Sequence, residues 1–272
     1  MHLPSHVNSY FDIPVTAELP RIICQVAAPL LSAKGIEVLD VRHRPLMFEE
    51  GYAKKHIQMK EEIGSLELYG QFPVLEVKEE NGTVTRFAQS ANIAKYLARL
   101  GELLGDPSDP NVANEASFID AMNEMQSRVG AIVETSAPED FTEIWQNEGV
   151  LLSLHRMENF LKQRLAEDDL PLESVGTGDK WVFNGRLGVV ELCCAALRRM
   201  ANFTYNEDIN GNCAMFDKEG LHFLQGVAAA AETHLARHEP VLSRVFIWHS
   251  DEAIENPAAD AYREWRSKFF AA

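Results

Sequence analysis

The feature that most constrains the fold is a change of pattern about one hundred residues into the chain. Before this point, short apolar stretches typical of strands alternate with helical patterns, and after it nearly every periodic segment is helical. A turn-rich segment, Gly105-Asp-Pro-Ser-Asp-Pro110, separates the two parts and is typical of a linker. We therefore predict a small mixed α/β domain at residues 1–104 and an all-α domain at residues 111–272.

The first part has the element order β-α-β-(irregular)-β-β-α. Strands are predicted over 7–11, 36–41, 72–77 and 83–87, with a hairpin turn at Asn81-Gly82 between the last two. One helix is predicted over 16–31, with Thr16 as its N-cap and Gly35 as the residue that terminates it. A second helix is predicted over 90–100, with Ser90 as its N-cap. The charged stretch 42–70 is irregular apart from a short helix around 52–62.

The second part is predicted to be an α-helical bundle. Its helices are expected at about 111–135, 140–167, 188–201 and 217–237. The terminal segment 239–272 carries six aromatic residues and is expected to pack as a last amphipathic helix, with lining of a ligand pocket as the alternative.

Composition restricts the partners. The 272 residues carry a formal charge of −16, which disfavours nucleic acid and anionic membrane as main partners. No apolar stretch is long enough to span a bilayer, and we interpret the N-terminus as having no signal peptide. The four cysteines form no CxxC pair, so the sequence predicts a reducing compartment, no disulfide framework and no metal site.

Three segments carry a resemblance to a known family. They are Ser9-Tyr-Phe11 followed by Ala17-Glu-Leu-Pro-Arg21, then Gly70-Gln-Phe-Pro-Val-Leu-Glu-Val77, then Gln89-Ser-Ala-Asn-Ile-Ala-Lys-Tyr-Leu-Ala98. Their order, with a helical second half, resembles the cytosolic glutathione S-transferase superfamily, nearest its tyrosine-type, sigma-like members. The resemblance covers most of the chain. It implies a thioredoxin-like first domain, a helical second domain with an electrophile pocket, glutathione as co-substrate, homodimerisation, and a cytoplasmic role in detoxification.

The resemblance also implies which residues bind glutathione. Pro73 matches the family's cis-proline, and Phe72 matches the residue whose backbone pairs with the cysteinyl part of the tripeptide. Gln89 and Ser90 match the pair that holds the γ-glutamyl end, where a helix N-terminus suits a carboxylate. The contacts to the glycine carboxylate are unassigned, with Lys60, among the lysines of residues 42–70, as a candidate.

Tyr10 is the predicted catalytic residue. The glutathione thiol is mostly protonated at neutral pH, and a tyrosine hydroxyl that donates a hydrogen bond to the sulfur favours the reactive thiolate. Tyr10 matches the Tyr of the Tyr-Phe pair that ends the first strand in tyrosine-type members. Thr16 is ranked second as a hydroxyl activator, whereas Cys24 lies in the apolar middle of its helix and is predicted to be core.

Several positions depart from the family pattern. Thr16 replaces the Arg that often lies near the sulfur, and Arg128 replaces the Asp that reaches toward the γ-glutamyl amine of the partner subunit, although Glu124 lies one turn away. The motif that begins a later helix appears as Gly185-x-x-Gly188-x-x-Glu191. Glycine is an acceptable N-cap and Glu191 can act as the capping-box partner, so the fold is expected to survive.

Three functions remain open at this point. The first is an enzyme that activates the glutathione thiolate for attack on a hydrophobic electrophile. The second, favoured by the departures at Thr16 and Arg128, is a non-catalytic binding or structural protein with the same fold. The third is a glutathione-dependent isomerase of the prostaglandin synthase kind, because fold alone does not decide the substrate.

Overall fold

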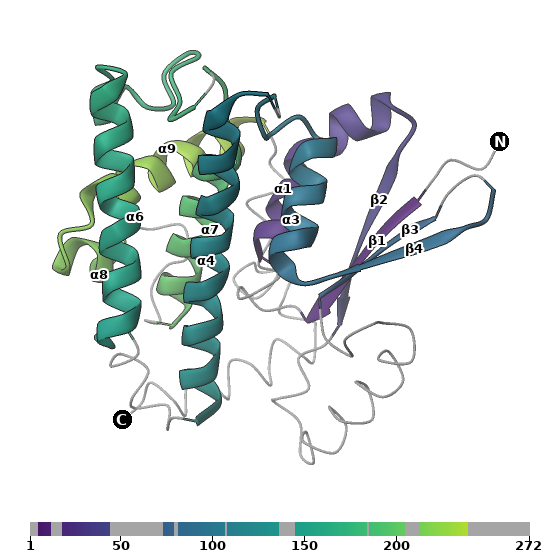
Figure 1. The fold of residues 1–272 in the computed structure, drawn as a ribbon, viewed down its shortest axis with the longest axis horizontal. Helices are drawn as coiled ribbons and strands as arrows, with labels where there is room; N and C mark the ends of the chain where they lie inside the picture. Colours follow the sequence, from purple (N-terminus) through teal and green to yellow (C-terminus); the bar gives the residue numbers. More distant parts are fainter. Residues whose placement is uncertain are drawn as a thin grey trace.

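The computed structural model of the chain describes residues 5–11, 18–43, 73–78, 81–106, 108–135, 145–183, 185–204 and 213–238. It consists of a β-sheet with two helices beside it, and a group of longer helices packed against those two (Figure 1). Helices α1 (Glu18–Ala33) and α3 (Ser90–Leu100) lie between the sheet and the long helices. Every described strand precedes α3, and every described element after α3 is helical.

The sheet has four strands among the described residues, in the order β2-β1-β3-β4. Strands β1 (Ser5–Phe11) and β2 (Glu37–His43) are parallel and are connected through α1, as a parallel pair requires. Strands β3 (Val74–Lys78) and β4 (Val84–Ala88) run antiparallel to each other, and β3 runs antiparallel to β1. The predicted turn at Asn81-Gly82 is confirmed, because Gly82 has a φ of +83°, which favours glycine.

Helix α1 ends as the sequence predicts. Gly35 has a φ of +73°, and the backbone N–H of Ile36 donates to the carbonyl of Leu31 at 2.8 Å, which reverses the chain toward β2. The predicted cap at Thr16 and the short helix at 52–62 lie outside the described residues.

The prediction that Ser90 is the N-cap of its helix is wrong by one residue. Gln89 occupies the N-cap position with a φ of +71°, and Ser90 is the first residue of α3. The reason is that a residue with positive φ cannot be helical, so the chain turns at Gln89 and the helix begins immediately afterwards.

The helical part contains a long helix at each of the four predicted places, but the helix predicted over 140–167 begins only at Glu148, because Asn147 is its N-cap. They are α4 (Pro110–Thr135), α6 (Glu148–Glu167), α7 (Val189–Thr204) and α9 (His222–His238), with a 3-10 turn, η3 (Leu172–Ser174), before α7. The segment predicted as one helix over 217–237 is instead divided, because α8 (Ala214–Lys218) ends before Gly220, whose φ of +69° turns the chain. The terminal segment 239–272 lies outside the described residues.

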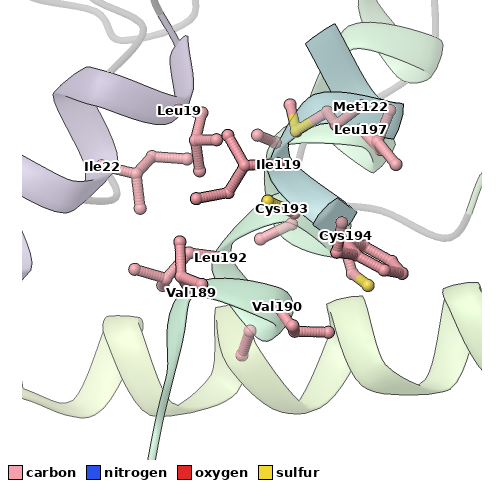
Figure 2. Packing of buried hydrophobic residues seen from close by; sticks show 14 of the residues in the cluster. Leu19, Ile22, Ile119, Met122, Val189, Val190, Leu192, Cys193, Cys194 and Leu197 are labelled. Carbon is pink, nitrogen blue, oxygen red and sulfur yellow. The ribbon is translucent and has the colours of Figure 1, made fainter. Parts of the chain in front are cut away.

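One apolar core joins the two parts. Figure 2 shows Leu19 and Ile22 of α1 beside Ile119 of α4 and beside Val189 and Leu192 of α7, and all five side chains are buried. Helix α7 is buried on nearly every side, which is typical of the central helix of a bundle. No helix within the described ranges is both long and apolar enough to cross a membrane.

Candidate functional site

Tyr10 lies one residue before the end of the central strand. Strand β1 pairs with β2 on one side and with β3 on the other, and the backbone of Tyr10 pairs with Arg42 of β2. The segment that follows β1, residues 12–17, connects it to α1. The backbone of Tyr10 therefore lies at the end of the sheet where β1 finishes, and we call this end the sheet edge.

Pro73 and Gln89 lie at the same edge of the sheet as Tyr10. Ser9 pairs with Val74, the first residue of β3, and Val74 pairs in turn with Ala88, the last residue of β4. Tyr10, Pro73 and Gln89 each lie one residue beyond that row, on neighbouring strands. Since neighbouring strands are about 4.8 Å apart, the backbones of Tyr10 and Gln89 are about 10 Å apart, with Pro73 between them.

The start of α3 gives this edge an environment suited to an anion. The first backbone N–H groups of a helix have no partner within it and carry the positive end of the helix dipole. No acidic residue lies in the first turn of α3. Ser90 is 6% exposed whereas Gln89 is exposed, so the two side chains differ in their access to a ligand.

Gln89 also has an unusual backbone. Its φ of +71° and ψ of 117° lie outside the regions that residues with a Cβ normally adopt, a conformation that costs about 1–3 kcal/mol. Such strain is concentrated at functional sites, where it fixes the direction of a backbone or side chain. Sequence reasoning missed this feature, because the residue type of Gln89 gives no signal of a positive φ.

Several predicted site residues lie outside the described residues. They are Phe72, Lys60 and Thr16. Pro73, by contrast, is described and buried, and it directly precedes β3, whereas the sequence predicts a strand that includes it.

Arg128 and Glu124 pair with each other on α4. An Nη atom of Arg128 donates to an Oε atom of Glu124 at 2.6 Å, and both side chains are exposed. Glu124 also lines a pocket of about 280 Å³ between α4 and α6, whose floor includes Phe118, Met157 and Phe160. All residues that line this pocket come from α4 and α6, so it is separate from the sheet edge that carries Tyr10.

The cysteines are buried rather than poised for reaction. Cys24, as predicted, lies in the core, and Cys193, Cys194 and Cys213 are buried with it. Burial, with the nearby charge of Glu191, raises the pKa of the Cys193 thiol well above its ordinary value. Within the described part of the chain, no group of three or more His, Cys, Asp or Glu side chains could hold a metal ion.

A buried ion-pair network connects α1 to α7 and α9. Arg199 of α7 contacts Glu18 of α1 and Glu232 of α9. Sequence reasoning missed this network, because its three members are separated by up to 214 residues and no local spacing relates them.

Comparison with known proteins places this fold. No protein-family model matches the sequence, and no curated protein matches it. Among solved structures, the sigma class glutathione transferase of Fasciola hepatica matches with a TM-score of 0.61 and 17% identity, over 89% of this chain and 96% of that chain.

Two further structures match over nearly the full chain. Monomeric Na-GST-3, a glutathione S-transferase of the hookworm Necator americanus, has a TM-score of 0.56 and 20% identity, over 96% of this chain and 97% of that chain. Prostaglandin synthase D of Nilaparvata lugens has a TM-score of 0.54 and 16% identity, over 96% and 98%. At identities this low the likeness shows the fold alone: the chain has the fold of these glutathione transferases, as the resemblance of the sequence motifs implied.

Proposed function

We propose that the protein is a glutathione S-transferase that activates the glutathione thiolate for attack on a hydrophobic electrophile. The observation that carries the proposal is the row formed by Tyr10, Pro73 and Gln89 at one edge of the sheet. Residues from three separate strand ends meet there, next to the N-terminus of α3. This is the arrangement that a tripeptide with a thiol and a carboxylate would use.

Each residue has a separate proposed role. The Tyr10 hydroxyl donates a hydrogen bond to the sulfur and stabilises the thiolate. The backbone of Phe72, held by Pro73, pairs with the cysteinyl part of glutathione. Gln89 and Ser90 bind the γ-glutamyl carboxylate at the start of α3, and Lys60 is the candidate contact for the glycine carboxylate.

The proposed organisation follows the same scheme. Residues 1–104 form a thioredoxin-like domain that binds glutathione, and residues 111–272 form the helical domain that contributes the electrophile pocket. We propose a homodimer acting in cytoplasmic detoxification. The solvent-exposed pocket between α4 and α6 supports an association surface. Na-GST-3, which has a similar fold, is monomeric, and the mass of this protein in solution distinguishes a homodimer from a monomer.

A glutathione-dependent isomerase is the second candidate. The observation that favours it is the similarity to a prostaglandin synthase D, with a TM-score of 0.54. The non-catalytic alternative depends on Thr16 and Arg128, which occupy positions where the family has charged contacts to glutathione.

The decisive experiment compares conjugation of glutathione to 1-chloro-2,4-dinitrobenzene by the wild-type protein and by Tyr10→Phe. We expect kcat to fall at least tenfold in the variant, which corresponds to about 1.4 kcal/mol of transition-state stabilisation. Tyr96→Phe is the matched control, because Tyr96 lies on α3 and its ring stacks on Phe87 at 4.6 Å, a contact that phenylalanine preserves.

The other outcomes are informative as well. Activity unchanged in Tyr10→Phe would transfer the role to Thr16, which Thr16→Ala then tests. Conversion of a prostaglandin endoperoxide without conjugation would favour the isomerase. Glutathione binding in calorimetry without either reaction would favour the non-catalytic protein.

A further inference from the structure

A single buried arginine joins the first helix of the sheet part to two helices of the bundle. Nη1 of Arg199, on α7, donates to Oε1 of Glu18 at 3.1 Å. Nε and Nη2 of the same guanidinium donate to the two carboxylate oxygens of Glu232, on α9, at 2.7 and 2.8 Å. The side chains of Arg199 and Glu18 are 2% and 0% exposed, and that of Glu232 is 12% exposed.

The geometry of this network is directional. Burial alone would lower the pKa of Arg199, but the charges and hydrogen bonds of Glu232 and Glu18 raise it above its ordinary value, so the guanidinium stays charged. One edge of the planar group faces Glu232 in a bidentate arrangement, and this leaves Nη1 for Glu18. Lysine, with one ammonium group, cannot reproduce this fork.

The apolar contacts around the network lack this directionality. Leu19 and Ile22 of α1 pack against Val189 and Leu192 of α7 (Figure 2). Apolar burial is strongly favourable but non-directional, and it tolerates small shifts of one helix along another. A buried ion pair contributes little net stability compared with apolar side chains of the same volume, although removal of one partner destabilises the fold. What the pair adds to the apolar contacts is a fixed direction.

The end of α1 that is held in this way is the end next to the proposed site. Glu18 is the first residue of α1, and Tyr10 precedes it by eight residues. The sheet holds β1 at one end of the connecting segment. The contact between Glu18 and Arg199 holds the other end against the helical part.

We propose that Arg199 is a positioning residue for thiolate activation. Through Glu18 it fixes the start of α1 against α7, and thereby the position of α1 relative to the end of β1 that carries Tyr10. This inference rests on the proposed glutathione transferase function. It assigns to Glu232 a different role, which is to hold the guanidinium in place and stabilise the packing of α7 on α9.

The test compares two isosteric variants of the same network, Glu18→Gln and Glu232→Gln. The measurements are kcat, KM for glutathione, the thiolate absorbance of the bound glutathione, and the denaturant midpoint of unfolding. Glu232→Gln disturbs two hydrogen bonds to Arg199 and Glu18→Gln only one, so Glu232→Gln is expected to lower the midpoint more.

Activity is expected to follow the opposite order. In Glu18→Gln, kcat and the thiolate absorbance should fall by about tenfold, a size typical of a small misplacement in an active site, while KM for glutathione changes by less than about threefold. In Glu232→Gln, kcat should stay within about twofold of wild type. Arg199→Lys should resemble Glu18→Gln, and it provides the second variant if Glu18→Gln fails to fold.

Arg164→Lys is the matched control for a paired arginine. Arg164 bonds Asp168, the C-cap residue of α6, at 2.6 Å, and its other partners among the described residues include Glu167 and the ring of Phe183, neither of them on α1, so this variant should keep the wild-type kcat. Loss of kcat that follows loss of stability across the variants would overturn the inference. A Glu18→Gln variant with the kcat of an active wild type would also overturn the inference, but it would leave the proposed glutathione transferase function intact. A wild-type protein that neither binds nor turns over glutathione would overturn both.

Discussion

Oε2 of Glu191 accepts a hydrogen bond from the backbone N–H of Gly188, three residues before it, at 3.0 Å. Its Oε1 accepts another from the backbone N–H of Val182 at 2.7 Å. Gly188 is the N-cap of α7, so this is one half of the capping box predicted from the spacing of the two residues. The carboxylate is fully buried, and it connects the chain before α7 to the start of the central helix.

This buried carboxylate predicts a pH dependence of stability. Burial raises the pKa of Glu191 from 4.5 to about 7, the charge of Glu115 adds to the rise, and the hydrogen bonds from backbone N–H groups oppose it. Between these two pH values the native state binds a proton that the unfolded state has released. Stability therefore falls as the pH rises from about 5 to about 8, by up to about 3 kcal/mol from this group.

The measurement is the free energy of unfolding of wild type and Glu191→Gln across this pH range. Glutamine does not titrate, so the stability of wild type relative to the variant should decrease as the pH rises. Subtracting the variant removes the contributions of the other carboxylates. A difference that is constant from pH 5 to pH 8 would show that Glu191 keeps the same protonation state in both forms.

A second carboxylate caps a helix from a distance. Oε1 and Oε2 of Glu158, on α6, accept hydrogen bonds from the backbone N–H groups of Phe223 and Leu224 at 2.8 Å each. These are N–H groups of the first turn of α9, where a negative charge is also favoured by the helix dipole. Glu158→Ala should lower the free energy of unfolding by about 2–3 kcal/mol, since one buried and one partly buried donor lose a charged acceptor.

The control for this prediction is Glu167→Ala on the same helix. Glu167 is an exposed member of the ion pair with Arg164, and pairs of this kind contribute at most about 1 kcal/mol. Denaturant titrations of the two variants give the comparison. Equal losses in Glu158→Ala and Glu167→Ala would contradict the capping role.

These two glutamates show what the sequence can predict and what it cannot. Glu191 and its partner Gly188 are three residues apart on one helix turn, and this local spacing is a recognisable signature. Glu158 and the start of α9 are 65 residues apart, so their contact depends on how α6 packs on α9. Local rules contain no information about that packing.

The candidate site likewise has features that could be predicted from the sequence and features that could not. The position of Tyr10 at a strand end could be predicted, and that of Pro73 beside the start of a strand could be predicted to within two residues, because each depends on a short pattern. Their common edge follows from strand order and register, which the family resemblance implied and the propensities alone did not. The positive φ of Gln89 could not be predicted, because a non-glycine residue adopts it only under constraint from the surrounding fold.

The cysteines should be inert in the native protein. All four thiols are buried, and burial raises the pKa of Cys193 and Cys194 well above the ordinary value, so little thiolate forms near neutral pH. A disulfide reagent such as dithionitrobenzoate should label none of them within minutes in buffer and all four in denaturant. Rapid labelling of one thiol in the native protein would contradict this burial.

Ser90 should affect the binding of glutathione more than its turnover. In the proposed site, the Ser90 hydroxyl at the start of α3 contacts the γ-glutamyl carboxylate, which is remote from the sulfur and is bound equally in the ground state and the transition state. Loss of one hydrogen bond to a charged group costs about 1.5–3 kcal/mol, so Ser90→Ala should raise Kd and KM for glutathione by at least about tenfold. The kcat at saturating glutathione should stay close to wild type, because uniform binding does not change the chemical step.

Ser117→Ala is the control, since Ser117 is exposed on α4 and its hydroxyl bonds the Ala113 carbonyl of its own helix. Calorimetry and initial rates distinguish the outcomes: an unchanged Kd would remove Ser90 from the site, and a fall in kcat at constant Kd would place it at the reacting sulfur instead.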